Sequence, residues 1–377
     1  MQLKVLFLVF HGFSEHNGIS KKIWGQIKGF RECGADVSLC YYQVLADGRR
    51  VWVADNNVIA DFGYGICAKV RKRFDYQALT EYILANDFSL VYMRSDHNAN
   101  PFTIRMVRRL REGKCKVLME IPTYPYDQEY QTWSMRIGLF VDRLYRRRLA
   151  KELNALVTFS DYNTIFGQKA IQISNGIDFD AIPLRQPILK PMNDHTIHLL
   201  AVAEVHYWHG FDRLIHGMAA YKKRGDKRVI FHLVGGLSEP RERQEILVPI
   251  EQFGLQDQVV LYGPMWGKEL DSLFDLADFA IGSLGRHRTG IDMIRTLKNR
   301  EYAARGIPFI YSETDKDFEK KPYTLKAVAD DSPIDIQQIL TFLHNASFRP
   351  IDIRNSISEL SWKEQMQKVL LDNLNEK

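Results

Sequence analysis

The stretch Leu297–Ile310, with the sequence LKNREYAARGIPFI, has the pattern of a short helix that leads directly into a buried strand. The helix opens in a basic loop, carries Glu301 on its first turn and ends at Gly306, after which 308–311 is the apolar run of the strand. A helix start suits a phosphate, because it offers free N–H groups and the positive end of a dipole. An acid one turn further along can accept the hydroxyls of a ribose. The stretch therefore fits a nucleotide held by its diphosphate and its sugar, or an ordinary helix-to-strand connection capped by Gly306.

Short apolar runs alternate with amphipathic segments along the whole chain, which predicts parallel sheets with helical crossovers. The predicted strands of the first half are 3–10, 36–42, 89–93, 115–120, 155–159 and 170–173. Those of the second half are 197–203, 229–234, 258–262, 278–281 and 307–311. Segment 175–196, with Asn-Gly-Ile-Asp and three prolines, separates the two series and has the composition of a linker. We therefore predict an α/β protein with two Rossmann-like domains.

The predicted domains are residues 1–180 and 181–360, followed by a helix over 361–377 that crosses back to the first domain. A chain of 377 residues is long enough for two such cores. No apolar run approaches the roughly 20 residues that span a bilayer, and the first ten residues are too short for a signal peptide. The four cysteines lack metal-ligand spacing, so we expect reduced thiols and a cytoplasmic protein.

Positive charge is concentrated in segment 133–151, although the net charge of the chain is only +5. This segment holds five arginines and one lysine against the single acid Asp142, with apolar residues between them. Such a helix suits peripheral contact with an anionic membrane surface, which would place the protein at the inner membrane face. It also fits a helix with one core face and one solvated basic face. Binding to nucleic acid is disfavoured, since no recognised motif is present and acids elsewhere nearly cancel the charge.

Four further segments follow predicted strands, at the edge where parallel sheets bind ligands. Gly18 leads into a helix after the first strand, where its backbone can approach an oxyanion closely. The loop 202–212 contains His209 and Gly210, and the basic loop 282–290 precedes the helix of the opening stretch. Tyr262-Gly263 ends another strand, where it either places backbone groups against a base or forms a simple turn.

Four motifs in order make nearly the whole chain resemble glycosyltransferase family four. They are Gly18-Ile19-Ser20, Ser174-Asn175-Gly176-Ile177-Asp178, Trp208-His209-Gly210-Phe211-Asp212, and Glu301 with Gly306-Ile307-Pro308. The resemblance implies the GT-B fold, in which two Rossmann-like domains face each other. It also implies a retaining transferase that uses a nucleotide-diphosphate sugar and needs no metal or other cofactor. By the same resemblance, the first domain binds the acceptor and the second binds the donor.

Three positions depart from the family pattern. Met293 stands where the family has the first acid of its Glu-x7-Glu pair, while Glu204 and His209 stand where it carries two cations. The remaining pattern, with Trp-His-Gly and Leu-Lys-x-Arg-Glu-Tyr, resembles a divergent branch found in surface-polysaccharide assembly. An inactive descendant that binds a nucleotide sugar or a polysaccharide is an alternative. A Rossmann oxidoreductase is a weaker one, because the chain lacks the GxGxxG fingerprint.

Roles in the donor site follow from the resemblance and the chemistry of the side chains. Glu301 would accept the ribose hydroxyls, Lys298 would pair with the phosphates, and His209 would donate to the leaving diphosphate. These residues, together with Asp127, are the expected catalytic set. The expected donor-binding set is Gly18, Gly210, Tyr262, Gly263, Arg286, Arg288, Lys298 and Glu301.

The acceptor side is predicted at segment 119–129, where polar and aromatic groups follow a strand between two prolines. Asp127 or Glu120 would orient or deprotonate the acceptor hydroxyl, and tyrosines would stack on sugar rings. The alternative is a loop that simply packs on the next helix. The expected acceptor-binding set is Asn17, Arg94, Glu120, Thr123, Tyr124 and Asp127. The acceptor itself would be lipid-linked or an oligosaccharide, in cell-surface polysaccharide synthesis.

Overall fold

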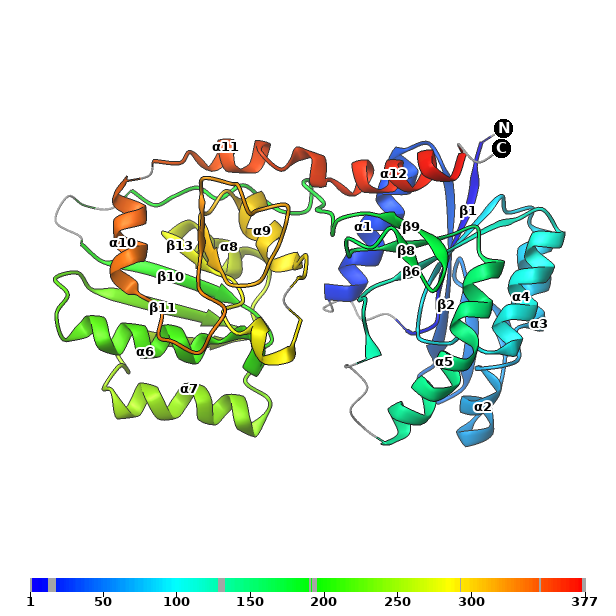
Figure 1. The fold of residues 1–377 in the computed structure, drawn as a ribbon, viewed down its shortest axis with the longest axis horizontal. Helices are drawn as coiled ribbons and strands as arrows, with labels where there is room; N and C mark the ends of the chain where they lie inside the picture. Colours follow the sequence, from blue (N-terminus) through cyan, green and yellow to red (C-terminus); the bar gives the residue numbers. More distant parts are fainter. Residues whose placement is uncertain are drawn as a thin grey trace. The chain divides into compact units, whose positions relative to one another are not determined.

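The structure is a computed structural model that describes residues 2–12, 18–127, 133–189, 191, 195–291, 293–345 and 347–374. The chain divides into two compact units (Figure 1). Unit 1 is Met1–Gly176 together with Trp362–Lys377, and unit 2 is Ile177–Ser361. These divisions fall within four residues of the boundaries expected from the sequence. No helix in the described ranges combines the length and apolar character needed to cross a bilayer.

Unit 1 is built on one nine-stranded sheet with the order β4-β3-β2-β1-β5-β6-β7-β9-β8. Its strands are β1 (Lys4–Val9), β2 (Asp36–Val44), β3 (Arg50–Ala54), β4 (Asn57–Asp61), β5 (Leu90–Arg94), β6 (Lys116–Ile121), β7 (Ala155–Thr158), β8 (Thr164–Ile165) and β9 (Gln168–Gln172). The run from β2 to β9 through β1, β5, β6 and β7 is parallel, as predicted. The antiparallel strands β3, β4 and β8 at the two edges were not predicted.

Helices cover both faces of this sheet. They are α1 (Gly18–Glu32), α2 (Gly65–Arg71), α3 (Gln77–Ala85), α4 (Pro101–Glu112), α5 (Trp133–Glu152) and α12 (Trp362–Leu374). One core includes the apolar residues of α3, α4 and α5, and a second core lies under α1 and α12. Strands buried on both faces explain the nearly continuous apolar runs in the sequence.

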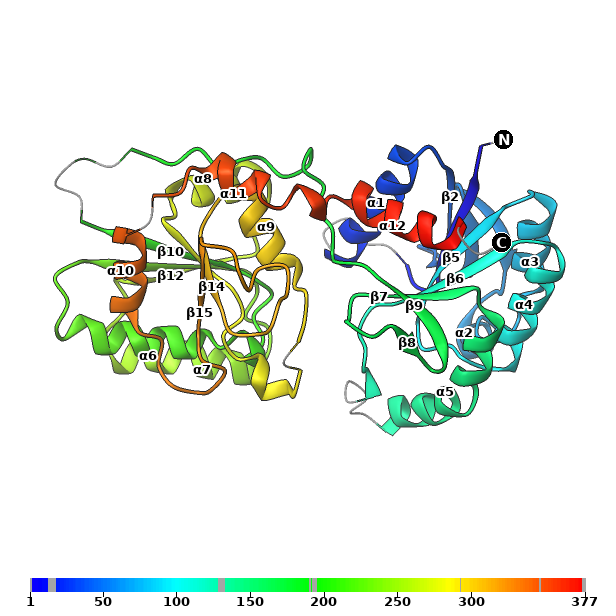
Figure 2. The same ribbon diagram turned by 45° about the horizontal axis from the view of Figure 1, so that its top comes forward.

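The last helix, α12, returns to unit 1, as predicted, and packs along α1 (Figure 2). Gly25 and Gly29 lie one turn apart on α1 and make room for Trp362. A Cβ atom at Gly25 would lie 2.3 Å from the indole, and one at Gly29 would lie 2.5 Å from the Trp362 carbonyl oxygen. Gln365 adds a hydrogen bond of 2.7 Å, which its side chain accepts from the Ser174 amide. These contacts bind the end of the chain to unit 1.

Unit 2 has a six-stranded sheet that is parallel throughout, in the order β12-β11-β10-β13-β14-β15. Its strands are β10 (Ile197–Val202), β11 (Val229–Val234), β12 (Val259–Gly263), β13 (Phe279–Ile281), β14 (Phe309–Tyr311) and β15 (Thr324–Lys326), of which only β15 was not predicted. The chain order reverses at β10, which lies between β11 and β13. Ligands of open α/β sheets bind at such a switch point, beside the carboxyl ends of the strands.

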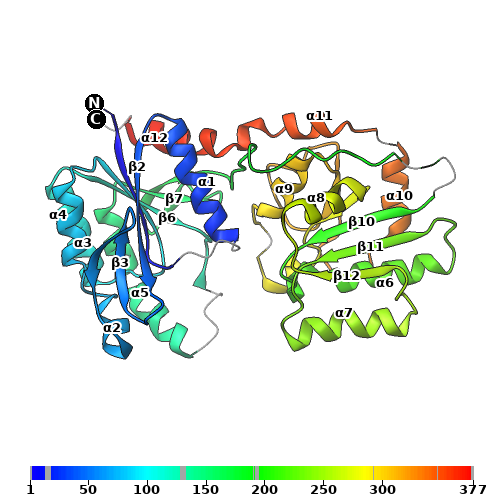
Figure 3. The same cartoon turned by 180° about the vertical axis from the view of Figure 1, so that it is seen from behind.

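Helices again lie on both faces of the unit 2 sheet (Figure 3). They are α6 (Phe211–Lys222), α7 (Pro240–Gln252), α8 (Gly267–Leu276), α9 (Leu297–Arg305), α10 (Ile336–Asn345) and α11 (Pro350–Asn355), with the short 3₁₀ turns η2 (Tyr207–His209), η3 (Arg286–Thr289) and η4 (Ser358–Leu360). The turns η2 and η3 follow β10 and β13, the two strands at the switch point. The fold class predicted from the sequence, α/β with parallel sheets, is confirmed.

Candidate functional site

The loops after β10 and β13 are joined backbone to backbone in unit 2. The Leu284 amide donates a hydrogen bond of 2.8 Å to the His209 carbonyl oxygen. Gly210 has a φ of 63°, and a Cβ atom there would lie 2.6 Å from the Gly285 nitrogen. The two loops can approach this closely only because glycine occupies both positions.

His209 is buried between the two loops as a neutral ring. Its Nδ1 atom accepts a hydrogen bond of 3.0 Å from the His206 amide, and its ring stacks on Phe211 with centroids 5.4 Å apart. Burial lowers the pKa of His209 well below its usual value, and the nearby charges of Lys298 and Arg286 lower it further. Because Nδ1 accepts, we assign the ring proton to Nε2, which makes Nε2 a hydrogen-bond donor.

Helix α9 begins beside these loops, and its first turn is capped by Thr296. From the sequence, Glu301 was expected on the first turn of this helix, but it lies on the second turn. Its carboxylate accepts a hydrogen bond of 3.2 Å from Arg305, which is also paired with Asp271 at 2.7 Å. The Glu301 side chain remains 32% exposed. It is therefore oriented by Arg305 and still open to a ligand. Gly306 ends the helix with a φ of 77°, as predicted.

Lys298 places its ammonium group at the start of α9 in an unusual environment. The Nζ atom is buried and has no hydrogen-bond partner within the described ranges. It lies 5.3 Å from the centroid of the Phe211 ring. Burial lowers the pKa of Lys298 from 10.5 to about 7, and the positive charge of Arg286 contributes to this shift. A buried amine without a partner is costly unless a ligand supplies an anion.

Glu313 and Asn299, which were not predicted from the sequence, also lie near the start of α9. Glu313 follows β14 and is 2% exposed, and its Oε1 atom accepts a hydrogen bond of 3.1 Å from the Asn299 side chain. The Glu313 Oε2 and Asn299 Oδ1 atoms are both buried without a partner in the described part of the chain. Burial raises the pKa of Glu313. The strand-end rule that selected the other loops, applied to β14, would have found this acid.

Two departures from the family pattern can be followed in the structure. Met293 is 49% exposed and its backbone forms an isolated bridge with Thr314. This position therefore carries no carboxylate, because its residue is a methionine. Its neighbour Asp292 lies outside the described residues. Glu204 accepts hydrogen bonds from the Ser238 hydroxyl at 2.8 Å and from the amide of Gly236 at 3.2 Å. These two hydrogen bonds hold the loop after β11 against Glu204.

The two arginines of the basic loop differ in their surroundings. Arg288 donates two hydrogen bonds to the Asp212 carboxylate, at 2.9 and 2.8 Å, and one of 2.7 Å to Asp331. Its guanidinium therefore holds the loop against α6. Arg286 lies 5.5 Å from the centroid of the Trp208 ring, and its charge acts on both His209 and Lys298. The structure thus brings Arg286, but not the clamped Arg288, into electrostatic contact with these two groups.

Tyr262 and Gly263 end β12 in the same unit. The Tyr262 hydroxyl is 2.8 Å from His232 Nδ1, which fixes the orientation of the phenol ring. Gly263 has a φ of 72°, and a Cβ atom would meet nothing within 4 Å. The space beside Gly263 leaves room for a ligand, in agreement with one interpretation of the sequence. The positive φ of Gly263 agrees equally well with the other interpretation, a simple turn.

In unit 1, Glu120 and Arg94 form part of a buried charge cluster. Glu120 is fully buried and accepts hydrogen bonds from Arg94, from Tyr92 at 2.7 Å and from Gln26 at 2.5 Å, with Lys22 3.6 Å away. Burial by itself raises the pKa of Glu120, but Lys22, Arg94 and the two neutral donors bring it below its usual value. A carboxylate held in this way is a weak base, so this environment does not favour the expected proton transfer.

Asp127 is also engaged by cations. Arg146 and Arg143, both on α5, approach its carboxylate oxygens to 2.6 and 2.7 Å. The hydrogen bonds from Arg146 and Arg143 lower the pKa of Asp127 despite its partial burial. This environment again does not favour a role as a base. The sequence alternative, a loop that packs on the next helix, describes these contacts well.

Two further residues of the expected acceptor-binding set, Thr123 and Tyr124, lie in this loop. Thr123 is half-buried, and the Tyr124 ring packs edge-on against Tyr162 with centroids 4.9 Å apart. Gly18, which the sequence analysis placed in the donor-binding set, is the first residue of α1 in unit 1, and a Cβ atom there would meet no described residue within 4 Å. Asn17 lies outside the described residues.

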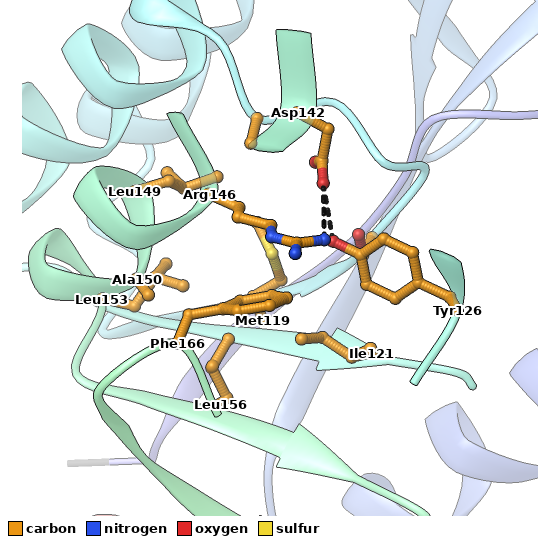
Figure 4. A pocket seen from close by; sticks show the side chains of 12 residues that line it. Met119, Ile121, Tyr126, Asp142, Arg146, Leu149, Ala150, Leu153, Leu156 and Phe166 are labelled. Carbon is orange, nitrogen blue, oxygen red and sulfur yellow. Dashed lines mark hydrogen bonds and ion pairs between the residues drawn. The ribbon is translucent and has the colours of Figure 1, made fainter. Parts of the chain in front are cut away.

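A small cavity lies beneath α5, close to this loop (Figure 4). Its volume is about 20 Å³, which is room for about one water. Figure 4 shows Arg146 reaching across it toward Asp142, and the Tyr126 hydroxyl donates a hydrogen bond of 2.7 Å to the same acid. The cavity is too small for a sugar.

The four cysteines are free thiols. Within the described ranges, no group of three histidine, cysteine or acidic side chains is arranged to hold a metal ion. The polar groups around Lys298 include the guanidinium of Arg286, the ring of His209 and the carboxylates of Glu301 and Glu313.

Solved glycosyltransferases share the fold of this chain. A glycosyltransferase from Rickettsia africae matches with a TM-score of 0.65 at 13% sequence identity, over 100% of both chains. Sucrose-phosphate synthase from Thermosynechococcus elongatus matches with a TM-score of 0.66 at 14% identity, also over 100% of both. HepE from Anabaena, solved in complex with UDP, has a TM-score of 0.61 at 14% identity over 98% of this chain and 100% of its own.

No protein-family model matches the sequence, and a search of curated proteins finds no significant match. At these identities the structural likeness establishes the fold. The two Rossmann-like units and the returning last helix thus belong to the GT-B fold of glycosyltransferases.

Proposed function

We propose that the protein is a glycosyltransferase of family four that takes its sugar from a nucleotide-diphosphate sugar bound in unit 2. The observation that carries this proposal is the buried, unpartnered ammonium group of Lys298 at the start of α9, one turn before the open carboxylate of Glu301. A helix start and a buried cation together favour a diphosphate. The solved HepE structures, which are described as complexes with UDP and with UDP-glucose, support the same class of donor.

The chemistry requires charge stabilisation at the leaving group. As the bond between the anomeric carbon and the diphosphate oxygen breaks, negative charge develops on that oxygen. Lys298, Arg286 and the Nε2–H group of His209 supply positive charge and a hydrogen bond on the same side of unit 2. The Glu301 carboxylate accepts the ribose hydroxyls. The unpartnered Glu313 and Asn299 oxygens are positioned to accept hydroxyls of the sugar.

The finer parts of the proposal rest on the family resemblance. The transfer is of a hexosyl type with retention, by attack on the same face as the departing diphosphate, so that the acceptor proton passes to the leaving oxygen. A metal ion is not required, because Lys298 and Arg286 provide the neutralising charge. The acceptor is lipid-linked or an oligosaccharide in cell-surface polysaccharide synthesis, and the reaction takes place in the cytoplasm.

The two acids expected to act as bases on the acceptor side are both paired with cations. Glu120 and Asp127 are each held by two cations, which suits them to shape the acceptor loops and not to remove a proton. In same-face transfer the leaving diphosphate can take that proton. A separate carboxylate base is then unnecessary.

The exposed Met293, and Arg288 with its guanidinium bound to Asp212, favour a second candidate, a protein that binds the donor without transfer.

The first test is a thermal-shift screen with UDP, GDP, ADP, CMP and NAD, with and without magnesium, because a ligand of the native state raises the melting temperature. One nucleoside diphosphate should stabilise the protein irrespective of metal. A matching sugar donor that binds but is never hydrolysed or transferred would select the second candidate.

The variant Glu301→Gln tests the ribose assignment by calorimetry. Losing hydrogen bonds to a charged acceptor should weaken binding of the selected nucleotide by about 10- to 150-fold. The wild type should lose the same factor when the ribose lacks its 2′- and 3′-hydroxyls, whereas the variant should lose almost nothing further. Glu269→Gln, an exposed acid on α8, is the matched control. Unchanged affinity in Glu301→Gln would refute the assignment.

A further inference from the structure

Helix α5 carries apolar side chains on two opposite faces. One face packs on the sheet of unit 1 through buried residues that include Leu139 and Leu149. The other face exposes a stripe whose side chains are between 38% and 80% accessible: Trp133, Ile137, Phe140, Val141 and Leu144. At 3.6 residues per turn these five positions lie on one side of the helix. A helix needs only one apolar face to pack on its own domain, so the second is available to a partner.

The exposed side of α5 becomes basic toward its end. Arg147, Arg148 and Lys151 are exposed there, and no acid of the helix opposes them. Asp142 is 2% exposed, and Glu152 is paired with Arg108 at 2.7 Å. The partner of this face should therefore combine an apolar layer with negative charge.

A second patch with the same character lies on α2, a segment that the sequence analysis did not single out. Tyr64, Ile66 and Val70 are 60%, 79% and 47% exposed. The basic residues Lys69 and Arg73 are exposed beside them. Figure 1 shows α2 and the beginning of α5 at the same end of unit 1. The apolar side chains at the beginning of α5 and those of α2, with Lys69 and Arg73, thus lie at one end of the unit. Arg147, Arg148 and Lys151 lie near the other end of α5, on the same side of that helix as its exposed apolar stripe.

We propose that the exposed side of α5, together with α2, docks on an anionic lipid surface. The apolar stripe of α5 and the side chains of α2 enter the boundary between headgroups and acyl chains, while the neighbouring arginines and lysines pair with lipid phosphates. A lipid surface accommodates two separate patches without the matched shape that a protein partner would need. The charge of both patches is complementary to that surface. The inference goes beyond the proposed function, because it rests on unit 1 alone and not on the donor site of unit 2.

Flotation with vesicles tests this surface directly. The full-length protein should float with vesicles of phosphatidylcholine and phosphatidylglycerol in equal parts, and should stay at the bottom with phosphatidylcholine alone. Arg147→Glu with Arg148→Glu should weaken vesicle binding roughly 30-fold or more, because each basic residue near an anionic surface contributes measurably. Phe140→Ser with Leu144→Ser, and Ile66→Ser with Val70→Ser, should each weaken it through the loss of apolar contact.

The matched control is Leu247→Ser with Val248→Ser, an exposed apolar pair on α7 of unit 2 that should leave flotation unchanged. Circular dichroism checks that every variant is folded. Equal flotation of all variants, or no flotation of the wild type, would overturn the inference. So would a dimer in light scattering that the same substitutions abolish, since a second copy would then cover the patches. Nucleotide binding should be the same in all docking variants, which separates failure here from failure of the donor site.

Discussion

Replacing Lys298 by methionine isolates the group on which the proposed donor site depends. In the free protein its Nζ atom is buried without a hydrogen-bond partner in the described ranges, and burial lowers its pKa from 10.5 to about 7. A shift of this size corresponds to on the order of 5 kcal/mol of unfavourable charging. Methionine keeps the length and apolar stem of the side chain and removes the charge.

The sign of the stability effect follows from proton linkage. The unfolded chain holds the Lys298 proton up to about pH 10.5, whereas the folded protein releases it above about pH 7. The penalty is therefore complete below pH 7, declines as the pH rises, and is absent above about pH 10.5. We expect Lys298→Met to be more stable than the wild type by about 2–5 kcal/mol at pH 6, and the difference should shrink toward pH 10.

Nucleotide binding should change in the opposite direction. A diphosphate gives the ammonium group its missing partner, so its loss should weaken binding by about 10- to 150-fold, as for other hydrogen bonds to charged groups. Binding should also restore the proton of Lys298. The wild type should take up about half a proton per nucleotide at pH 7 and close to one at pH 8, in excess of the variant.

Titration calorimetry in buffers of different ionisation enthalpy measures affinity and proton uptake together, and chemical denaturation at several pH values measures stability. Lys223→Met, an exposed lysine at the end of α6, is the matched control and should alter neither property. A methionine variant that kept the wild-type affinity and proton uptake would refute the reasoning. An apo stability that did not depend on pH would also contradict it.

Two further substitutions test the packing that positions the sites. Gly210→Ala should lower the stability of unit 2 by about 2–4 kcal/mol, since the added Cβ atom meets the Gly285 nitrogen and the residue has positive φ; scanning calorimetry should show a melting temperature about 5–15 °C lower. Glu120→Gln should cost about 3–5 kcal/mol in denaturant unfolding near neutral pH, because Lys22 and Arg94 would be left buried without their anion. The pKa of Glu120 is lowered in the folded protein. Its carboxylate therefore stabilises the fold above the pKa that it has in the unfolded chain, and this stabilisation should be lost as the pH falls through the lower pKa of the folded protein.

Each of these predictions has a control within the chain. Gly263→Ala also changes a residue with positive φ, but it meets open space and should cost only about 1 kcal/mol. Glu152→Gln removes a surface ion pair with exposed arginines and should cost less than about 1 kcal/mol. Equal losses at the two glycines, or a Glu120→Gln variant as stable as Glu152→Gln, would contradict the packing argument.

Local patterns in the sequence were enough to predict the order of most strands along the chain and the class of the fold. Strands buried on both faces of a parallel sheet leave continuous apolar runs, and helical crossovers leave amphipathic ones, so both are visible locally. The cap at Gly306 was visible for the same reason, since glycine acts on the backbone where it stands. The strands β3, β4, β8 and β15 were missed. Of these, β4 and β15 are largely exposed and therefore lack the continuous apolar run of a buried strand.

Which polar side chains are open to a ligand depends on contacts between segments that are distant in the sequence. Arg288 is hydrogen-bonded to Asp212, which is 76 positions away, and Glu120 is hydrogen-bonded to Arg94, which is 26 positions away. No local pattern contains such pairings, because they depend on which strand ends become neighbours in the sheet. For the same reason, two features became visible only once β13, β14 and α9 were placed together. They are the buried Lys298 Nζ atom without a hydrogen-bond partner in the described ranges, and Glu313 beside Asn299. Whether a charge is paired depends on packing between distant segments, and that packing is a property of the folded chain.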